Sequence, residues 1–219
     1  MPLRFGILCF PNVQQLDLTG PYEVFASARG AEVHLVWKDL QPIRSATGLM
    51  LTPDTRLADA PDFDVLCVPG GSGVNALLSD EEVLAFVRDK ASRARFVTSV
   101  CTGALVLGQA GLLSGRRATT HWNALDFLPR FGATPVEERV VRDGPIMTAG
   151  GVTSGIDFGL TVIAELLGRE EAETIQLSLE YAPAPPFGAG LPNTASASVL
   201  ASARERMAGS RREREALLA

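Results

Sequence analysis

Three short apolar runs set the strongest limit on what this chain can fold into. Residues 4–10 (RFGILCF), 65–68 (VLCV) and 96–100 (FVTSV) contain almost no charged side chains. Runs of this length without polar alternation are typical of strands that are covered on both faces. Segments with helical character follow them, so the sequence predicts an α/β fold, a mostly parallel sheet with helices on both faces.

Turn and capping residues indicate where the other elements begin. Pro21 is expected to begin the first helix, with Thr19 or Gly20 as its N-cap. Residues 79–82 (SDEE) have the composition of a capping box before another helix. The remaining expected elements are strands at 32–37 and 118–121, a helix at 122–131, a hairpin over 140–148 that turns at Asp143-Gly144, and helices at 155–168 and 170–181.

The composition changes near residue 182. Residues 182–190 (APAPPFGAG) resemble a linker, and residues 194–219 form a polar pattern rich in Ala, Arg and Glu that predicts a helix. We therefore expect an α/β domain over residues 1–182 and a linker with a helical extension over residues 183–219. Packing on a partner subunit is one possible use of this extension.

Charge and composition exclude several classes of protein. A net charge of −5 argues against nucleic acid as the main partner. The first residues are expected to form a strand rather than a signal peptide, and no apolar run approaches the roughly 20 residues that span a bilayer. Three cysteines and two histidines, without Cys-x-x-Cys or His-x-x-x-His spacing, predict neither a disulfide framework nor a structural metal site. We expect a cytoplasmic protein.

Cys101 lies at the joint between the predicted strand 96–100 and the helix that follows. Sites in α/β sheets form beyond the carboxyl ends of the strands, and a nucleophile on a tight strand-to-helix turn points out of the sheet there. The N–H groups and partial positive charge of a helix N-terminus favour a thiolate and can lower its pKa to about 6. Cys101 is the candidate nucleophile, whereas Cys9 and Cys67 are expected to be small buried side chains inside strands.

Two further stretches point to the same edge of the sheet. Residues 69–73 (PGGSG) end a strand in glycines, which let backbone N–H groups approach a ligand closely, and a simple turn is the alternative. Asp17 follows the first strand and places a carboxyl group near this edge. Capping of the first helix is the alternative use for Asp17.

Three motifs in this order resemble the DJ-1/PfpI superfamily: DVLCVPGGSG, VTSVCTGALVLGQAGLLSGRRATTHW and TAGGVTSGIDFGL. The resemblance covers roughly residues 3–182. It implies a flavodoxin-like sandwich of the class I glutamine amidotransferase-like type, with the cysteine on a nucleophile elbow. Many members carry Glu and His where this chain has Asp17 and Thr102, and this combination is similar to the isocyanide hydratase branch. Such an enzyme, a lyase, adds water to an isocyanide to give an N-substituted formamide.

The resemblance also implies a mechanism without a cofactor or metal. A Cys101 thiolate would attack the terminal isocyanide carbon and form a thioimidate, with Asp17 as general acid and base. Burial beside a thiolate raises the pKa of a carboxyl group, so Asp17 is expected to be protonated at rest. Thr102 and Gly71 are expected to position water and stabilise developing charge. A homodimer is the implied assembly.

Five other residues are candidates for the walls of the pocket. Gly150, Gly151 and Thr153 are expected on the wall opposite the cysteine, and a tight turn before the next helix is the alternative. In some members of the superfamily a His from the corresponding strand end accompanies the cysteine, so His121 is a candidate, but a structural role is equally open. Trp122 is a second candidate for the pocket wall, and burial in the core is the alternative.

Four other functions remain open at this stage. Another cysteine enzyme, such as a glyoxalase, amidase or protease, is disfavoured because the Cys-His pair is missing. A thiol redox sensor is compatible with a low-pKa cysteine. A ligand-binding regulator domain without its DNA-binding half is compatible with the motifs, which also occur in AraC-type regulators, because only about 35 residues follow the predicted core. A chaperone-like module would need an exposed apolar stretch, which we do not find.

Overall fold

A seven-stranded sheet forms the centre of the computed structural model, which describes residues 2–219. Its strands are β1 (Leu3–Leu8), β2 (Ala31–Trp37), β5 (Thr55–Arg56), β6 (Val65–Val68), β7 (Phe96–Val100), β10 (Val140–Asp143) and β11 (Ile146–Ala149). Their order is β10-β11-β7-β6-β1-β2-β5, and all neighbours are parallel except β10 and β11. The predicted α/β fold and the predicted hairpin at Asp143-Gly144 are confirmed.

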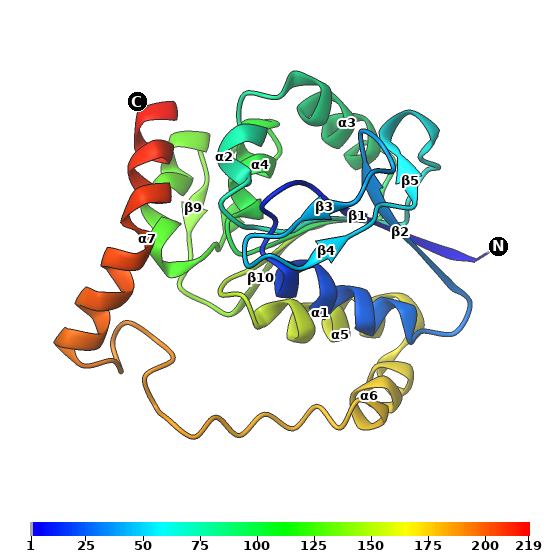
Figure 1. The fold of residues 1–219 in the computed structure, drawn as a ribbon. Helices are drawn as coiled ribbons and strands as arrows, with labels where there is room; N and C mark the ends of the chain where they lie inside the picture. Colours follow the sequence, from blue (N-terminus) through cyan, green and yellow to red (C-terminus); the bar gives the residue numbers. More distant parts are fainter. Residues whose placement is uncertain (1) are drawn as a thin grey trace.

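Helices cover both faces of this sheet (Figure 1). On one face lie α1 (Gln15–Ala26) and α5 (Ser154–Leu167), with α6 (Arg169–Ser178) beside α5, and on the other lie α2 (Val74–Leu77), α3 (Glu81–Ala91) and α4 (Gly103–Gln109). The smaller elements are β3 (Ile43–Arg44), β4 (Met50–Leu51), β8 (Arg117–Ala118), β9 (Thr134–Pro135) and the 3₁₀ helices η1 (Leu57–Asp59) and η2 (Trp122–Phe131). Every residue of β6 and β7 is buried, as the uninterrupted apolar runs predict.

The first helix begins earlier than the sequence predicts. Gln14 is the N-cap of α1, so Pro21 lies inside the helix and not at its start. A Cβ atom at Gly20 would lie 3.2 Å from Cγ1 of Ile156, which shows how closely α1 packs on α5. This packing offsets the hydrogen bond that Pro21 cannot donate, so tertiary contact overrides the local signal.

Two other element boundaries also differ from the sequence prediction. Asp80, and not the preceding serine, caps α3, because its carboxylate accepts a hydrogen bond from the N–H of Val83 at 3.3 Å. The strand predicted over residues 118–121 ends already at Ala118, and His121 becomes the N-cap of η2. The predicted helices at 122–131, 155–168 and 170–181 are present as η2, α5 and α6.

The C-terminal part of the chain is a linker followed by α7 (Ala197–Leu217). Residues 181–196 contain no helix or strand, in agreement with the linker-like composition. α7 lies beside η2, on the left of the molecule in Figure 1, and Arg211 of α7 donates a hydrogen bond to Asp126 of η2. Within residues 2–219, no helix combines the length and the apolar character that crossing a membrane requires.

Four loops meet at one edge of the sheet. The strand order reverses between β1 and β6, because β2 and β5 follow on one side of β1 while β6, β7 and β11 follow on the other. Loops diverge at such a switch point and leave a crevice beyond the carboxyl ends of the strands. Asp17, Gly71, Cys101 and Gly150 all lie in the segments that follow β1, β6, β7 and β11 at this edge.

Candidate active site

Cys101 occupies the turn between β7 and α4. Its φ angle is 55°, in the left-handed region that side chains other than glycine seldom adopt. Its N–H donates to the carbonyl of Ala149 at 2.9 Å, and its carbonyl accepts from Oγ1 of Thr120 at 2.6 Å. These bonds hold the backbone in a strained conformation, which is typical of functional sites.

Asp17 lies in the first turn of α1 close to Cys101, and each of these two groups shifts the pKa of the other. Its side chain is fully buried, and its Oδ2 accepts a hydrogen bond from the N–H of Gly70 at 3.0 Å. Its Oδ1 has no hydrogen-bond partner within residues 2–219. The carboxyl group therefore does not cap its own helix but faces the cysteine.

The glycines after β6 explain how Asp17 reaches this position. The N–H of Gln14 donates to the carbonyl of Gly70 at 2.8 Å, and Val13 forms a β-bridge with Gly71. Gly71 has a φ of 131°, and a Cβ atom there would come within 2.4 Å of the nitrogen of Gln14. Only glycine allows this approach, which fastens the loop after β1 to the loop after β6.

The two acidic groups of this pair have unusual protonation equilibria. Burial raises the pKa of Asp17 to about 7, although hydrogen bonds from Gly70 and Cys101 oppose the rise. Burial and the charge of Asp17 raise the pKa of Cys101 well above its ordinary value, although the N–H and hydroxyl of Thr102 lower it. The prediction that the helix N-terminus lowers the pKa of Cys101 is therefore wrong, because desolvation of the buried thiol outweighs it.

The protons of Cys101 and Asp17 are coupled. Near neutral pH the pair retains at least one proton, since the pKa of each group is raised. If that proton lies on Asp17, the carboxyl O–H donates to the sulfur and favours the thiolate, which the two donors of Thr102 also stabilise. Transfer of one proton from the thiol to the carboxylate therefore converts Cys101 into a nucleophile and Asp17 into an acid.

Thr102 connects the cysteine turn with the glycine loop. Its Oγ1 accepts a hydrogen bond from the N–H of Gly71 at 3.0 Å and donates to the carbonyl of Gly71 at 3.4 Å, and its backbone N–H and its hydroxyl also lower the pKa of the Cys101 thiol. The structure thus brings together the two residues predicted to stabilise charge. In this arrangement the N–H of Gly71 orients the Thr102 hydroxyl.

A hollow of about 260 Å³ opens beside Cys101. Thr102, Gly71 and His121 are the other sequence-predicted residues that line it. The residues not predicted are Gln14, Ala46, Ser72, Asn123, Ala124 and Val152, together with Arg206, Met207, Ser210 and Arg214 of α7. Sequence reasoning missed the α7 residues because a polar helix has the pattern of a solvated one, and the spacing of Met207, Ser210 and Arg214 was the only sign of a shared face.

The turn between β11 and α5 approaches the hollow but contributes a different residue. Val152 lines the wall. Its neighbours are tied to the turn, since the N–H of Gly150 donates to the carbonyl of Arg139 at 2.9 Å and Oγ1 of Thr153 accepts from Nη2 of Arg139 at 3.2 Å. Gly150, Gly151 and Thr153 therefore lie beside the hollow without being among its lining residues.

His121 has a structural task at the edge of the hollow. Its Nδ1 accepts a hydrogen bond from the N–H of Asn123 at 3.2 Å and thereby caps η2. Burial, assisted by the positive charge of Arg214, lowers the pKa of His121 to about 4. The imidazole is therefore neutral at neutral pH and does not act as a reserve of protons for the cysteine.

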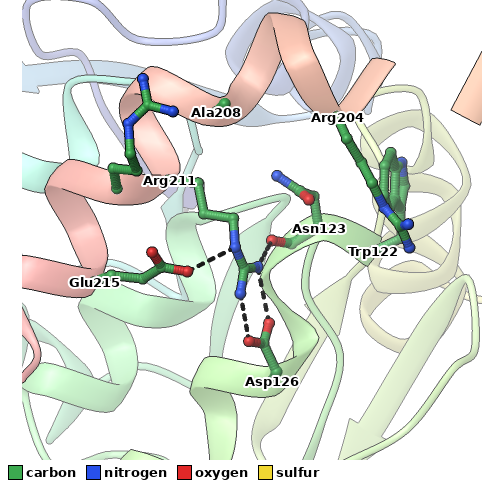
Figure 2. A pocket seen from close by; sticks show the side chains of 8 residues that line it. Trp122, Asn123, Asp126, Arg204, Ala208, Arg211 and Glu215 are labelled. Carbon is green, nitrogen blue, oxygen red and sulfur yellow. Dashed lines mark hydrogen bonds and ion pairs between the residues drawn. The ribbon is translucent and has the colours of Figure 1, made fainter. Parts of the chain in front are cut away.

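Trp122 lines a different and larger hollow of about 500 Å³ between η2 and α7 (Figure 2). Arg211 of α7 bridges this region, since its Nη1 and Nη2 donate to the two carboxyl oxygens of Asp126 at 3.0 and 2.6 Å. Its Nε also pairs with Glu215 at 2.9 Å. These contacts fasten α7 to η2, and the hollow they surround is separate from Cys101.

The described residues show no cluster of three or more His, Cys, Asp or Glu side chains that could hold a metal ion.

The fold and the site together define a flavodoxin-like α/β protein with a cysteine on a strand-to-helix turn and a buried aspartate beside it. The model of the DJ-1/PfpI family matches residues 4–165, and the chain belongs to the DJ-1/PfpI family.

Two relatives are similar over nearly the whole chain. An isonitrile hydratase of Pseudomonas putida is 60% identical over 210 residues, which cover 96% of this chain and 92% of the relative. The crystal structure of a THiJ/PfpI family protein from Pseudomonas syringae has a TM-score of 0.96 and 44% identity, and the match covers 100% of this chain and 91% of that one. The HTH-type transcriptional regulator GbdR of Pseudomonas aeruginosa is 30% identical over 188 residues, 82% of this chain, which span only 51% of the regulator.

Proposed function

We propose that this protein is an isocyanide hydratase, a lyase that adds water to an isocyanide and releases an N-substituted formamide. The observation that carries the proposal is the 60% identity to an isonitrile hydratase over 96% of the chain. The buried pair of Cys101 and Asp17 supplies a nucleophile and a proton donor that influence each other's pKa. These observations do not favour the alternative functions. The alternatives were a different type of cysteine enzyme, a redox sensor, a regulator domain and a chaperone-like module.

The first step forms a covalent intermediate. With the shared proton on Asp17, the Cys101 thiolate attacks the terminal carbon of R–N≡C, and Asp17 delivers its proton to the same carbon. A carbon–sulfur bond and a carbon–hydrogen bond form, which gives the thioimidate Cys–S–CH=N–R and leaves Asp17 as a carboxylate. The negative charge has moved from sulfur to carboxylate, and the total charge of the pair is unchanged.

Water then releases the product. The Asp17 carboxylate takes a proton from water as its oxygen attacks the thioimidate carbon, and that proton passes to the nitrogen. When the tetrahedral intermediate collapses, the carbon–sulfur bond breaks, the hydroxyl proton returns to Asp17 and R–NH–CHO leaves. The two donors of Thr102 stabilise the charge on sulfur during attack and departure.

Turnover of an aromatic isocyanide, followed as the appearance of the formamide, tests this function. The wild-type protein should produce the formamide and Cys101→Ala should not. Mass spectrometry of protein quenched during turnover should find the thioimidate on the peptide that contains Cys101. Absence of formamide with the wild-type protein would remove the proposal.

Three broader properties belong to the same proposal. The protein acts in the cytoplasm as a homodimer, and its substrate is a small molecule rather than nucleic acid or membrane lipid. The family supports the assembly, and the net charge of −5 supports the absence of a nucleic-acid partner. Residues 1–182 form the α/β domain that contains Cys101 and Asp17, and residues 183–219 form an extension whose helix α7 lines the hollow beside Cys101. Analytical ultracentrifugation tests the homodimer.

A further inference from the structure

Arg214 is a buried cation that lines the hollow beside Cys101. Only 5% of its surface is exposed, and it projects from α7, the helix that the sequence places outside the α/β domain. Burial of an unpaired charge is costly, so buried arginines are usually paired with carboxylates. Arg214 therefore calls for a physical explanation.

Within residues 2–219, no carboxylate forms an ion pair with Arg214. Its Nη2 makes one long contact of 3.4 Å with Oγ of Ser210, and its Nε has no hydrogen-bond partner. The guanidinium lies 6.0 Å from the centre of the Phe127 ring, a distance compatible with a cation–π contact, which does not replace a carboxylate partner. Burial lowers the pKa of Arg214, although the charges of Cys101 and Glu213 oppose this effect.

The nearby carboxylate of Glu213 is directed elsewhere. Its Oε2 accepts a hydrogen bond from Nδ2 of Asn75 on α2 at 2.7 Å, and the same amide group donates to the carbonyl of Ser210 at 3.0 Å. Together with the pair of Arg211 and Asp126, which Figure 2 shows, these bonds hold α7 over the hollow beside Cys101. Arg214 is held in place by its helix rather than by an ion pair of its own.

The hollow itself favours an anion. Arg206 of α7 also lines it, and no Asp or Glu is among the residues of its wall. The donors of a guanidinium match the two oxygens of a carboxylate, and a volume of about 260 Å³ suits a compact substrate.

We propose that Arg214 binds a carboxylate on the substrate while Cys101 attacks the isocyanide carbon, so that the preferred substrates are isocyanides that carry a carboxylate. This inference rests on the proposed hydratase function. It assigns to α7 a role in substrate selection and explains why a polar helix covers the hollow. The alternative, in which Arg214 acts on the charge of the sulfur, would affect all isocyanides equally.

Isocyanoacetate and its methyl ester separate these roles, because they share the reacting group and differ in charge. The wild-type protein should have the higher kcat/KM for isocyanoacetate. Arg214→Met should lower kcat/KM for isocyanoacetate by about 10- to 100-fold, mostly through KM, since hydrogen bonds to charged groups contribute on this order. Turnover of the methyl ester should change by less than about threefold.

Two further variants keep the test decisive. Arg214→Lys retains the charge and should recover part of the loss for isocyanoacetate, whereas Arg212→Met, at an exposed arginine of the same helix, should change neither substrate. N-Formylglycine, the product from isocyanoacetate, should inhibit wild-type protein more strongly than Arg214→Met.

Equal losses of kcat/KM for both substrates in Arg214→Met, or no loss for either, would overturn the inference. If wild-type protein converts neither isocyanide, the proposed function fails as well, whereas ester turnover without dependence on Arg214 overturns this inference alone.

Discussion

Asp17→Asn should separate the catalytic from the structural contribution of the buried carboxyl group. Asparagine keeps the shape and an oxygen that can accept from the N–H of Gly70, but it cannot release a proton. General acid–base groups contribute about 10²- to 10⁴-fold, so formamide production should fall by that order. The fold should survive, since the side chain remains buried with its main hydrogen bond.

The same substitution should change how stability depends on pH. The pKa of Asp17 rises from 3.8 in the unfolded chain to about 7 in the folded protein, so the folded state binds this proton more tightly. Its contribution to the free energy of unfolding is therefore lost as the pH rises from about 4 to about 7. The loss amounts to at most about 4 kcal/mol, and about 2 to 3 kcal/mol of it falls between roughly pH 5 and pH 8.

Urea titrations of both proteins at roughly pH 5 and pH 8 measure this difference. The wild-type protein should lose more free energy of unfolding between the two pH values than Asp17→Asn does. Asp62→Asn is the matched control, because Arg93 lowers the pKa of the exposed Asp62 and its titration lies below this interval. An identical pH dependence in the wild-type protein and Asp17→Asn would refute the argument that burial keeps Asp17 protonated.

Three other predictions concern the neighbours of the carboxyl group. Cys101→Ala should abolish formamide production while Cys9→Ala keeps most of it, and comparable turnover in both would remove the covalent step. Asp17→Asn should speed the alkylation of Cys101 by iodoacetamide at about pH 8, because loss of the carboxylate charge lowers the pKa of the thiol; slower alkylation would contradict this sign. His121→Asn should leave the pH profile of kcat unchanged near neutrality, since a ring with a pKa of about 4 does not titrate there, and loss of an ionisation from the profile would assign a proton-transfer role to His121.

Local patterns in the sequence were sufficient for most of the secondary structure. The apolar runs at 65–68 and 96–100 became fully buried parallel strands, and the Asp143-Gly144 turn joined β10 to β11. These features depend on hydrophobic patterning and turn conformations, which neighbouring residues decide. The same logic placed Cys101 on a strand-to-helix turn, where its φ of 55° marks a position that the surrounding fold maintains.

The raised pKa of Asp17 was expected from the family resemblance, but the raised pKa of Cys101 was not. A helix N-terminus is a local feature, and by itself it predicts a lowered pKa for Cys101. Desolvation depends on everything packed around the sulfur, including Asp17 from a helix that begins earlier than Pro21 suggests. Because close packing on α5 overrides the local signal at Pro21, the start of α1 could not be predicted from nearby residues.

Tertiary structure alone decided which distant segments share the site. Asp17 and Gly70 are 53 positions apart in the chain, and a hydrogen bond joins them because the loops after two adjacent parallel strands are fastened to each other. Trp122 follows His121 directly in sequence, yet the two side chains line different hollows. Arg214 lines the hollow beside Cys101 because α7 packs on η2 and α2. A polar helix has no periodic apolar face from which this packing could be predicted. Short-range chemistry therefore fixed the strands and the nucleophile, whereas the charges that surround the nucleophile depend on long-range packing.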